Sequence, residues 1–228
     1  MLNAKSLLDN LVGGLSQATG GQGAKGLADK AKATWDNQST LGKGAIAGGL
    51  LGLLLTGGGR RMLGTGLKIG GMAAIGGLAY KAYDDWKNGR TGEVTALPAP
   101  EGSAFQPGDA LAADDLATRL LQAMIAAAKA DGHVTPDERA AIDGQLAGLG
   151  LGADAEALIT TELDAPLDVG RIAALARNEA EATQLYAASL LVVDEQSPAE
   201  KGYLAMLAAR MSLDQGLVDR LHAEAARL

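Results

Sequence analysis

The sequence predicts an all-α protein in which a glycine-rich, membrane-associated helical segment precedes a helical bundle. Apolar residues between Leu116 and Ala128 recur at three-to-four-residue spacing, which is the period of a helix with one buried face. Two uncharged, glycine-rich runs, residues 44–59 and 69–80, come earlier in the chain. We find no β-branched run long enough to form a sheet.

Charge and glycine content divide the 228 residues into two halves. Residues 1–97 carry a net charge of +5 and residues 98–228 a net charge of −12, and 24 of the 32 glycines lie before residue 109. Such a contrast is typical of two modules joined by a linker. We therefore predict a partly ordered tail at 1–40, a glycine-zipper membrane segment at 41–90, a flexible linker at 91–110 and a helical domain at 111–228.

The composition also excludes several classes of function. Without cysteine the chain has no disulfide scaffold, thiol nucleophile or Cys-ligated zinc site, and its two histidines are too few for a His-rich metal site. An isoelectric point of about 4.9 argues against non-specific nucleic-acid binding. Sequence motifs of nucleotide loops, nucleophile elbows and zinc proteases are missing. We therefore expect no enzymatic activity, no organic cofactor and no nucleic-acid partner.

The lengths of the two uncharged runs indicate association with a membrane. As helices they measure about 24 Å and about 18 Å, against a bilayer core of about 30 Å. Lys43, Arg60 and Lys81 flank the runs, where basic side chains extend to the headgroups. Segment 41–86 is therefore interpreted either as a helical hairpin in the membrane or as a single span with an interfacial helix, and its orientation stays open.

The glycine spacing supports close packing of helices in lipid. Gly44, Gly48 and Gly52 recur every four residues, which lets two helix backbones approach each other. Five leucines between residues 50 and 55 argue against a solvated linker. We expect lipid contacts and a homo-oligomer formed through the glycine faces. Three aromatic residues stand where an interfacial belt lies at the end of a membrane helix: Tyr80, Tyr83 and Trp86.

Helix start and stop signals mark the elements of the acidic half. The first helix is expected to end near Asp131-Gly132, and Thr135 is expected to cap the next one, with Pro136 at its first position and Glu138 completing a capping box. Further helices are predicted at about 153–163, 168–177, 178–193, 198–211 and 214–227.

An internal echo suggests two related helix–loop–helix units in this domain. The segment 197–200, Ser-Pro-Ala-Glu, matches Thr-Pro-Asp-Glu at 135–138 at an offset of 62 residues. Asp194 corresponds to Asp131 if one loop residue is deleted. Each unit therefore has an aspartate that ends one helix and a glutamate that opens the next.

The candidate metal ligands are the four loop carboxylates of these units, Asp131, Glu138, Asp194 and Glu200. Spacing in the first loop fits the second half of an EF-hand, but the earlier ligand positions fall on Ala127 and Lys129, which cannot coordinate a cation. A site shared by both units would suit calcium, magnesium or manganese. A second interpretation stays open, in which the glutamates are helix caps and the aspartates are solvated.

Several motifs together resemble the YebE-like bacterial inner-membrane proteins, whose C-terminal domain belongs to the TerB-like tellurite-resistance group. These motifs are residues 127–134, residues 138–143, Pro166-Leu167-Asp168, Arg177-Asn178-Glu179 and Tyr203-Leu204. The resemblance implies an all-helical TerB-like bundle of two pseudo-repeated units at the inner, or cytoplasmic, membrane. It implies metal binding by Asp131 and Glu138 and, through the echo, by Asp194 and Glu200, in a context of envelope or metal stress.

These observations lead to two expected functions. The first is a membrane-anchored, non-enzymatic module whose TerB-like domain binds a divalent cation, an unknown protein partner or both. The second is a metal-independent membrane scaffold whose helical domain docks another protein.

Overall fold

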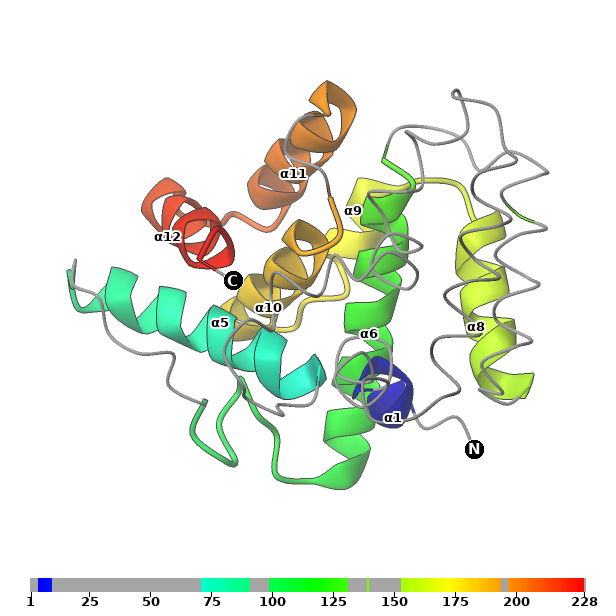
Figure 1. Ribbon diagram of the computed structural model, residues 1–228, viewed down its shortest axis with the longest axis horizontal. Coiled ribbons are helices and arrows are strands. Elements are labelled where there is room, and N and C mark those ends of the chain that lie inside the picture. The colour runs from blue at the N-terminus through cyan, green and yellow to red at the C-terminus, as the bar shows by residue number, and fades with distance from the viewer. Residues whose placement is uncertain are drawn as a thin grey trace, which may run out of the picture.

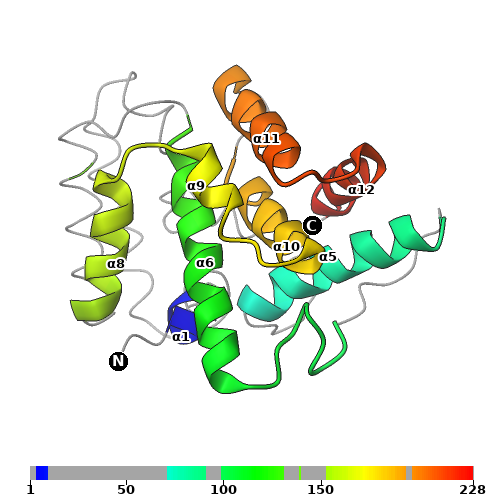
Figure 2. The same cartoon turned by 180° about the vertical axis from the view of Figure 1, so that it is seen from behind.

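The computed structural model describes residues 4–9, 71–90, 99–130, 139, 153–193 and 197–227. Every regular element in these residues is a helix, which confirms the all-α prediction for this part of the chain (Figures 1 and 2). The helices are α1 (Ala4–Leu8), α5 (Gly71–Lys87), α6 (Ala110–Ala128), α8 (Ala153–Asp164), α9 (Val169–Ala173), α10 (Glu179–Leu190), α11 (Pro198–Arg210) and α12 (Gln215–Ala225). The uncharged run 44–59 and the loops at 131–138 and 194–196 lie outside the described residues.

Helix α10 lies at the centre of the bundle. Nine consecutive residues, 182–190, are buried, so the helix has neighbours on all sides. Helices α5, α6, α11 and α12 all pack against it. Two of its buried hydroxyl groups bond within the helix: Thr183 donates to the Glu179 carbonyl at 2.8 Å and Ser189 to the Leu185 carbonyl at 3.0 Å. The polar side chains of α10 are therefore compatible with a buried helix.

Short polar side chains begin most helices of the acidic half. Each accepts a hydrogen bond from a backbone N–H of the first turn, which has no partner within the helix. The capping residues are Asp109 for α6, Asp168 for α9, Asn178 for α10, Ser197 for α11 and Asp214 for α12. The helices predicted from start and stop signals after residue 150 are confirmed, with ends that differ by a few residues.

Helix α5 contains most of the second uncharged run, which the sequence placed in a membrane segment, either a hairpin or a single span with an interfacial helix. In the structure this helix packs against α10 and α12 instead, and buries Met72, Ile75, Leu78, Ala79 and Ala82. The missing side chain of Gly76 lets the backbone of Phe105 lie directly against α5, because a Cβ atom at position 76 would lie 2.5 Å from the carbonyl oxygen of Phe105. Among the described residues, no helix is both long and apolar enough to cross a bilayer.

The aromatic residues expected at a membrane interface are partly buried and pack against the core of the bundle. Tyr80 and Tyr83 contact the ring of Phe105, with centroids 5.6 Å and 5.4 Å away. Phe105 is 6% exposed and belongs to the segment that the sequence marks as a linker. The indole N–H of Trp86 donates to the carboxylate of Asp214 at 2.9 Å, which connects α5 to the start of α12.

A buried ion pair also joins α5 to α12. The Lys81 ammonium lies 2.7 Å from the Asp85 carboxylate and 3.0 Å from that of Glu224, and all three side chains are nearly buried. Burial acts against the lysine charge, but the hydrogen bonds to Asp85 and Glu224 outweigh it and raise the pKa of Lys81. Lys81, expected from the sequence to reach lipid headgroups, thus has its partners in the bundle.

We expect the Gly76→Ala variant to be less stable than the wild type by about 1 to 2 kcal/mol. The added methyl group collides with backbone rather than with a flexible side chain, which outweighs the gain in helix propensity. Gly202→Ala is the matched control, since Gly202 is also in a helix but a methyl group added there would meet no atom within 4 Å. Denaturant unfolding of the full chain measures the free energy of unfolding of both variants. Equal stabilisation by the two substitutions would contradict the close contact with Phe105.

We expect Lys81→Met to lower the free energy of unfolding by about 3 kcal/mol, because it leaves the buried Asp85 carboxylate without its cation. Lys87→Met removes a lysine from the last turn of the same helix, where the ammonium contacts only the exposed side of Tyr83. Its unfolding midpoint should stay close to that of the wild type. Thermal unfolding compares the two variants, and similar midpoints would rule out the α5–α12 ion pair.

Candidate functional site

Glu200 is the member of the predicted ligand set that falls within the described residues. It is the third residue of α11 and is 3% exposed. The hydroxyl oxygen of Ser197 accepts a hydrogen bond from the Glu200 backbone N–H at 3.4 Å, and Pro198 occupies the first turn. This confirms the predicted helix start. The carboxylate itself is not at the solvated surface, which differs from an ordinary exposed capping residue.

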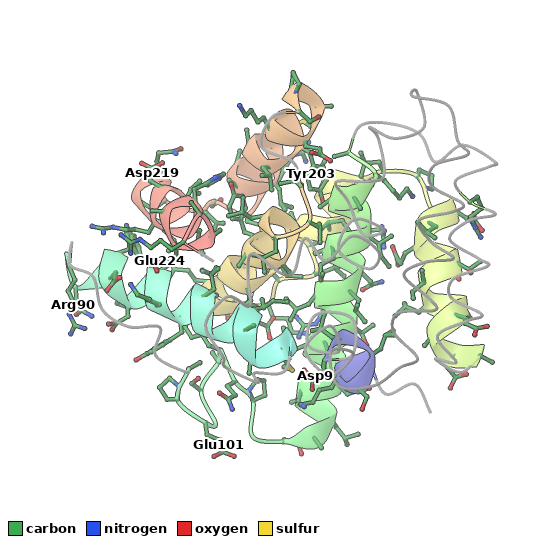
Figure 3. All side chains as sticks on the ribbon, in the orientation of Figure 1. Asp9, Arg90, Glu101, Tyr203, Asp219 and Glu224 are labelled. Atoms are coloured by element: carbon green, nitrogen blue, oxygen red, sulfur yellow. The ribbon has the colours of Figure 1, made fainter. Side chains whose placement is uncertain are left out.

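Glu200 shares the inner face of α11 with Tyr203 and Leu207, since residues three and four apart lie on one side of a helix. Tyr203 is 1% exposed and lies between α11 and the neighbouring helices α9 and α10 (Figure 3). Burial raises the pKa of the Tyr203 hydroxyl, against smaller opposing effects of Ser189 and Arg171. The hydroxyl is therefore protonated at neutral pH and is a poor proton-transfer group.

Lys129, two residues before Asp131, closes the C-terminal end of α8. Its ammonium donates to the carbonyl oxygens of Glu162, at 2.9 Å, and of Ala165. Cations are favoured at this end of a helix because its last carbonyls are unpaired. Burial lowers the pKa of Lys129, although Glu162 opposes this effect. Lys129, which cannot coordinate calcium, therefore has a structural role here.

Arg139, directly after Glu138, also pairs with α8. Its guanidinium forms an ion pair with the carboxylate of Asp164, the last residue of that helix. The hydrogen bond from Arg139 lowers the pKa of Asp164. The described charged residues on either side of the first predicted loop, Lys129 before it and Arg139 after it, thus both bind the same end of α8.

A third cation, Arg171 of α9, binds the buried carboxylate of Glu162. Its guanidinium nitrogens lie 2.6 Å and 3.2 Å from the two carboxylate oxygens, and the Gln122 amide donates to one of them at 2.6 Å. Burial would raise the pKa of Glu162, but hydrogen bonds from Arg171 and Gln122 outweigh it and hold this pKa below its usual range. This glutamate therefore stays ionised and joins α6, α8 and α9.

A similar pair joins α6 to α10. Arg119 donates to both oxygens of Glu181, at 2.6 Å and 3.2 Å, and to the Leu175 carbonyl at 2.9 Å. Burial opposes the charge of Glu181, but the bonds from Arg119 and from the Arg177 backbone N–H lower its pKa. The pairing of Glu181 with Arg119 is a contact across 62 residues, which local spacing does not indicate.

Three of the four predicted metal ligands, Asp131, Glu138 and Asp194, lie outside the described residues. Within the described residues there is no group of three or more His, Asp or Glu side chains that could hold a metal ion. The proposed calcium, magnesium or manganese site therefore stays a prediction that depends on both loops.

Several residues of the motifs that carry the family resemblance are structural. Asp168 caps α9 and Asn178 caps α10, each by accepting a backbone N–H bond. Tyr203 and Leu204 belong to the buried core. These residues thus define where helices begin and how they pack, which is the information that a fold family shares.

The comparisons with known proteins identify a family and do not assign an activity. Residues 40–225 match a family described as protein of unknown function (DUF533). A protein of Yersinia enterocolitica, described as an uncharacterized protein in the ampR 5′ region, is 34% identical over 106 residues, which is 46% of this chain and 76% of that protein. No solved structure matches.

The family match extends from the start of the glycine-rich segment to the last helix, and is consistent with the resemblance to YebE-like proteins. The match does not show the TerB-like domain that the resemblance implies. Because the matched region covers most of the sequence, the chain belongs to the DUF533 family of proteins of unknown function.

Proposed function

We propose that this chain is a membrane-attached, non-enzymatic binding module of the bacterial inner membrane, whose TerB-like bundle binds a divalent cation. The cation is calcium, magnesium or manganese, and its ligands are Asp131, Glu138, Asp194 and Glu200. The observation that carries the proposal is the burial of Glu200 at 3% exposure. Positive charge nearby stabilises a buried carboxylate, and a cation shared with the other three acids adds such charge.

The membrane part of the proposal rests on the first uncharged run. Residues 44–59 contain no charged side chain and include five leucines, which a solvated segment would not favour. The glycines repeated every four residues suit close contact between helices, so lipid and a second copy of the chain are the expected neighbours.

The bundle itself favours binding over catalysis. Its buried charges are paired between helices, as in the ion pairs of Lys81 with Glu224, Arg119 with Glu181 and Arg171 with Glu162. The Nε2 atom of His222 lies 2.9 Å from the Tyr186 hydroxyl and joins α12 to α10. These groups stabilise the fold, and none of them forms a pair of nucleophile and general base.

The second candidate function is a metal-independent scaffold that docks another protein. It is favoured by the outer face of α11, where the Met206 side chain is 54% exposed on a helix whose inner face is fully packed. In this function Glu200 is only part of the helix start that Ser197 caps. The envelope or metal stress context belongs to both candidates, since it comes from the family resemblance alone.

Cation titration of the full chain separates the two candidates. The protein, purified in detergent and stripped with chelator, is titrated with calcium, magnesium and manganese while thermal unfolding is followed. We expect one cation to raise the unfolding midpoint saturably, by about 5 to 10 °C at a hundredfold excess over its Kd. Glu200→Gln, and the double variant Asp131→Asn with Asp194→Asn, should lose this cation-dependent shift even if their starting midpoints are lower.

Glu101→Gln is the matched control, because Glu101 is an exposed loop glutamate far from α11 (Figure 3). It should keep the full cation-dependent shift. If no cation raises the midpoint, or if all variants respond equally, the cation site is excluded and the scaffold function remains.

A further inference from the structure

Helix α8 is attached to the bundle along one narrow face. Two of its apolar side chains, Ala155 and Ile159, are buried, and Glu162 is the third buried residue of this 12-residue helix. The spacing of four and three residues places them on one side of the helix, which packs on α6. Figures 1 and 2 show α8 next to α6 and away from α11 and α12. Compared with α10, which has nine buried residues, α8 therefore gains little stability from apolar burial.

Charged and polar groups hold the C-terminal end of α8 instead. Their bonds all reach residues 162–165, which are the end of the helix and the residue after it. One carboxylate and two backbone carbonyls of this end are bound inside the interface, and a second carboxylate is bound nearer the surface. The groups that make these bonds are Gln122 of α6, Lys129 directly after α6, Arg139, and Arg171 of α9.

These groups recognise general features of an acidic helix. A guanidinium and an amide on one carboxylate select a glutamate or an aspartate, and the two-fold bond from arginine fixes its orientation. An ammonium on the last carbonyls suits the negative end of any helix. A glutamate near the helix end, with an aliphatic residue three positions before it and a small one seven positions before it, meets the same requirements. We call Gln122, Lys129 and Arg171, together with the face of α6 that α8 covers, the α8-binding surface.

Part of the α8-binding surface is open to solvent while α8 is in place. The Arg171 side chain is 38% exposed, whereas the side chain of its partner Glu162 is 7% exposed. A second carboxylate can therefore approach Arg171 from solvent and exchange with Glu162 without passing through the core.

We propose that the α8-binding surface is a docking site for an acidic amphipathic helix of a partner protein, and that α8 occupies it as an internal stand-in which the partner displaces. The partner helix supplies a glutamate to Arg171 and Gln122, its last carbonyls to Lys129, and one small and one aliphatic side chain to α6. This inference goes beyond the function proposed above, since it requires neither a membrane nor a bound cation.

Local charge favours this partner despite the net charge of the domain. Residues 98–228 carry a net charge of −12, so an acidic helix is repelled at long range. At physiological salt, charge interactions across solvent are screened beyond about 8 Å. Lys129 and Arg171 act at hydrogen-bond distance, as their bonds of 2.9 Å and 2.6 Å to residue 162 show. The two cations therefore determine which helix stays bound.

Competition between α8 and a free peptide tests the proposal. The probe is a fluorescent peptide of residues 153–166, blocked at both ends, which carries the contacts of α8 itself. Its binding to the full chain, purified in detergent, is followed by fluorescence anisotropy in the presence of chelator. In the Glu162→Gln chain, α8 is held less tightly while the α8-binding surface is unchanged. We expect the peptide to bind this variant at least tenfold more tightly than the wild type, because a larger fraction of the surface is free.

Matched changes separate docking from a loss of structure. A peptide with Glu162→Gln should bind the Glu162→Gln chain at least tenfold more weakly than the wild-type peptide does. Asp164→Asn, a milder release of α8 in the chain, removes an exposed ion pair and should raise the peptide affinity about two- to fivefold. Glu156→Gln changes a glutamate in the first turn of α8, at the opposite end from these contacts, and should leave the affinity at the wild-type value.

Two results would overturn the proposal. The first is an equal affinity of the peptide for the wild-type, Glu162→Gln and Asp164→Asn chains, or equal binding of the two peptides. The second is a Glu162→Gln chain that forms a dimer in light scattering and does not bind the peptide, since the α8-binding surface would then take α8 of a second copy rather than a partner protein.

Hydrogen exchange measures the release of α8 without any peptide. Raising NaCl from 0.1 M to 1 M shortens the screening length from about 10 Å to about 3 Å, which weakens ion pairs and leaves apolar burial in place. We expect the backbone amides of α8 to exchange several-fold faster at the higher salt, and those of α10 to be unchanged. Protection of α8 as strong as that of α10 at both salt concentrations would contradict a displaceable α8.

Discussion

The complete burial of α10 is the constraint on which the rest of the structure depends. A helix with nine consecutive buried residues has no solvated face, so it is stable only when other helices cover every side. Helices α5, α6, α11 and α12 provide that cover. The Gln184 amide reaches outside the helix and donates to the Ala104 carbonyl at 2.9 Å, which also fixes the segment before α6.

This constraint explains why α5 belongs to the bundle. Its glycines and small apolar residues suit a helix in lipid and a helix in a tightly packed protein core equally well, because both environments are apolar. The sequence pattern alone therefore does not separate the two environments. The separating contacts are long-range: Gly76 against Phe105, Lys81 with Glu224, and Trp86 with Asp214. Local spacing contains no information about such pairs.

Features with local causes were predictable. Ser197, Asp168 and Asn178 begin helices because a short acceptor side chain can bond to its own first turn, and the sequence analysis expected helix starts at these positions. For the candidate site, the helix start at Ser197 and Glu200 was predictable for the same reason. The burial of Glu200 was not, since it depends on how the inner face of α11 packs against other helices.

The ion pair between Lys81 and Glu224 sets an order for folding during synthesis. The two residues are 143 positions apart, and α12 is the last helix of the chain. At about 5 to 20 residues per second, the ribosome needs about 7 to 30 s to deliver the partner of α5 after Lys81 has been made. Throughout that interval the apolar face of α5 lacks α12, and for the larger part of it α10 has not been made either. The nascent chain therefore carries two adjacent apolar runs that a chaperone or a membrane surface can bind before the bundle closes.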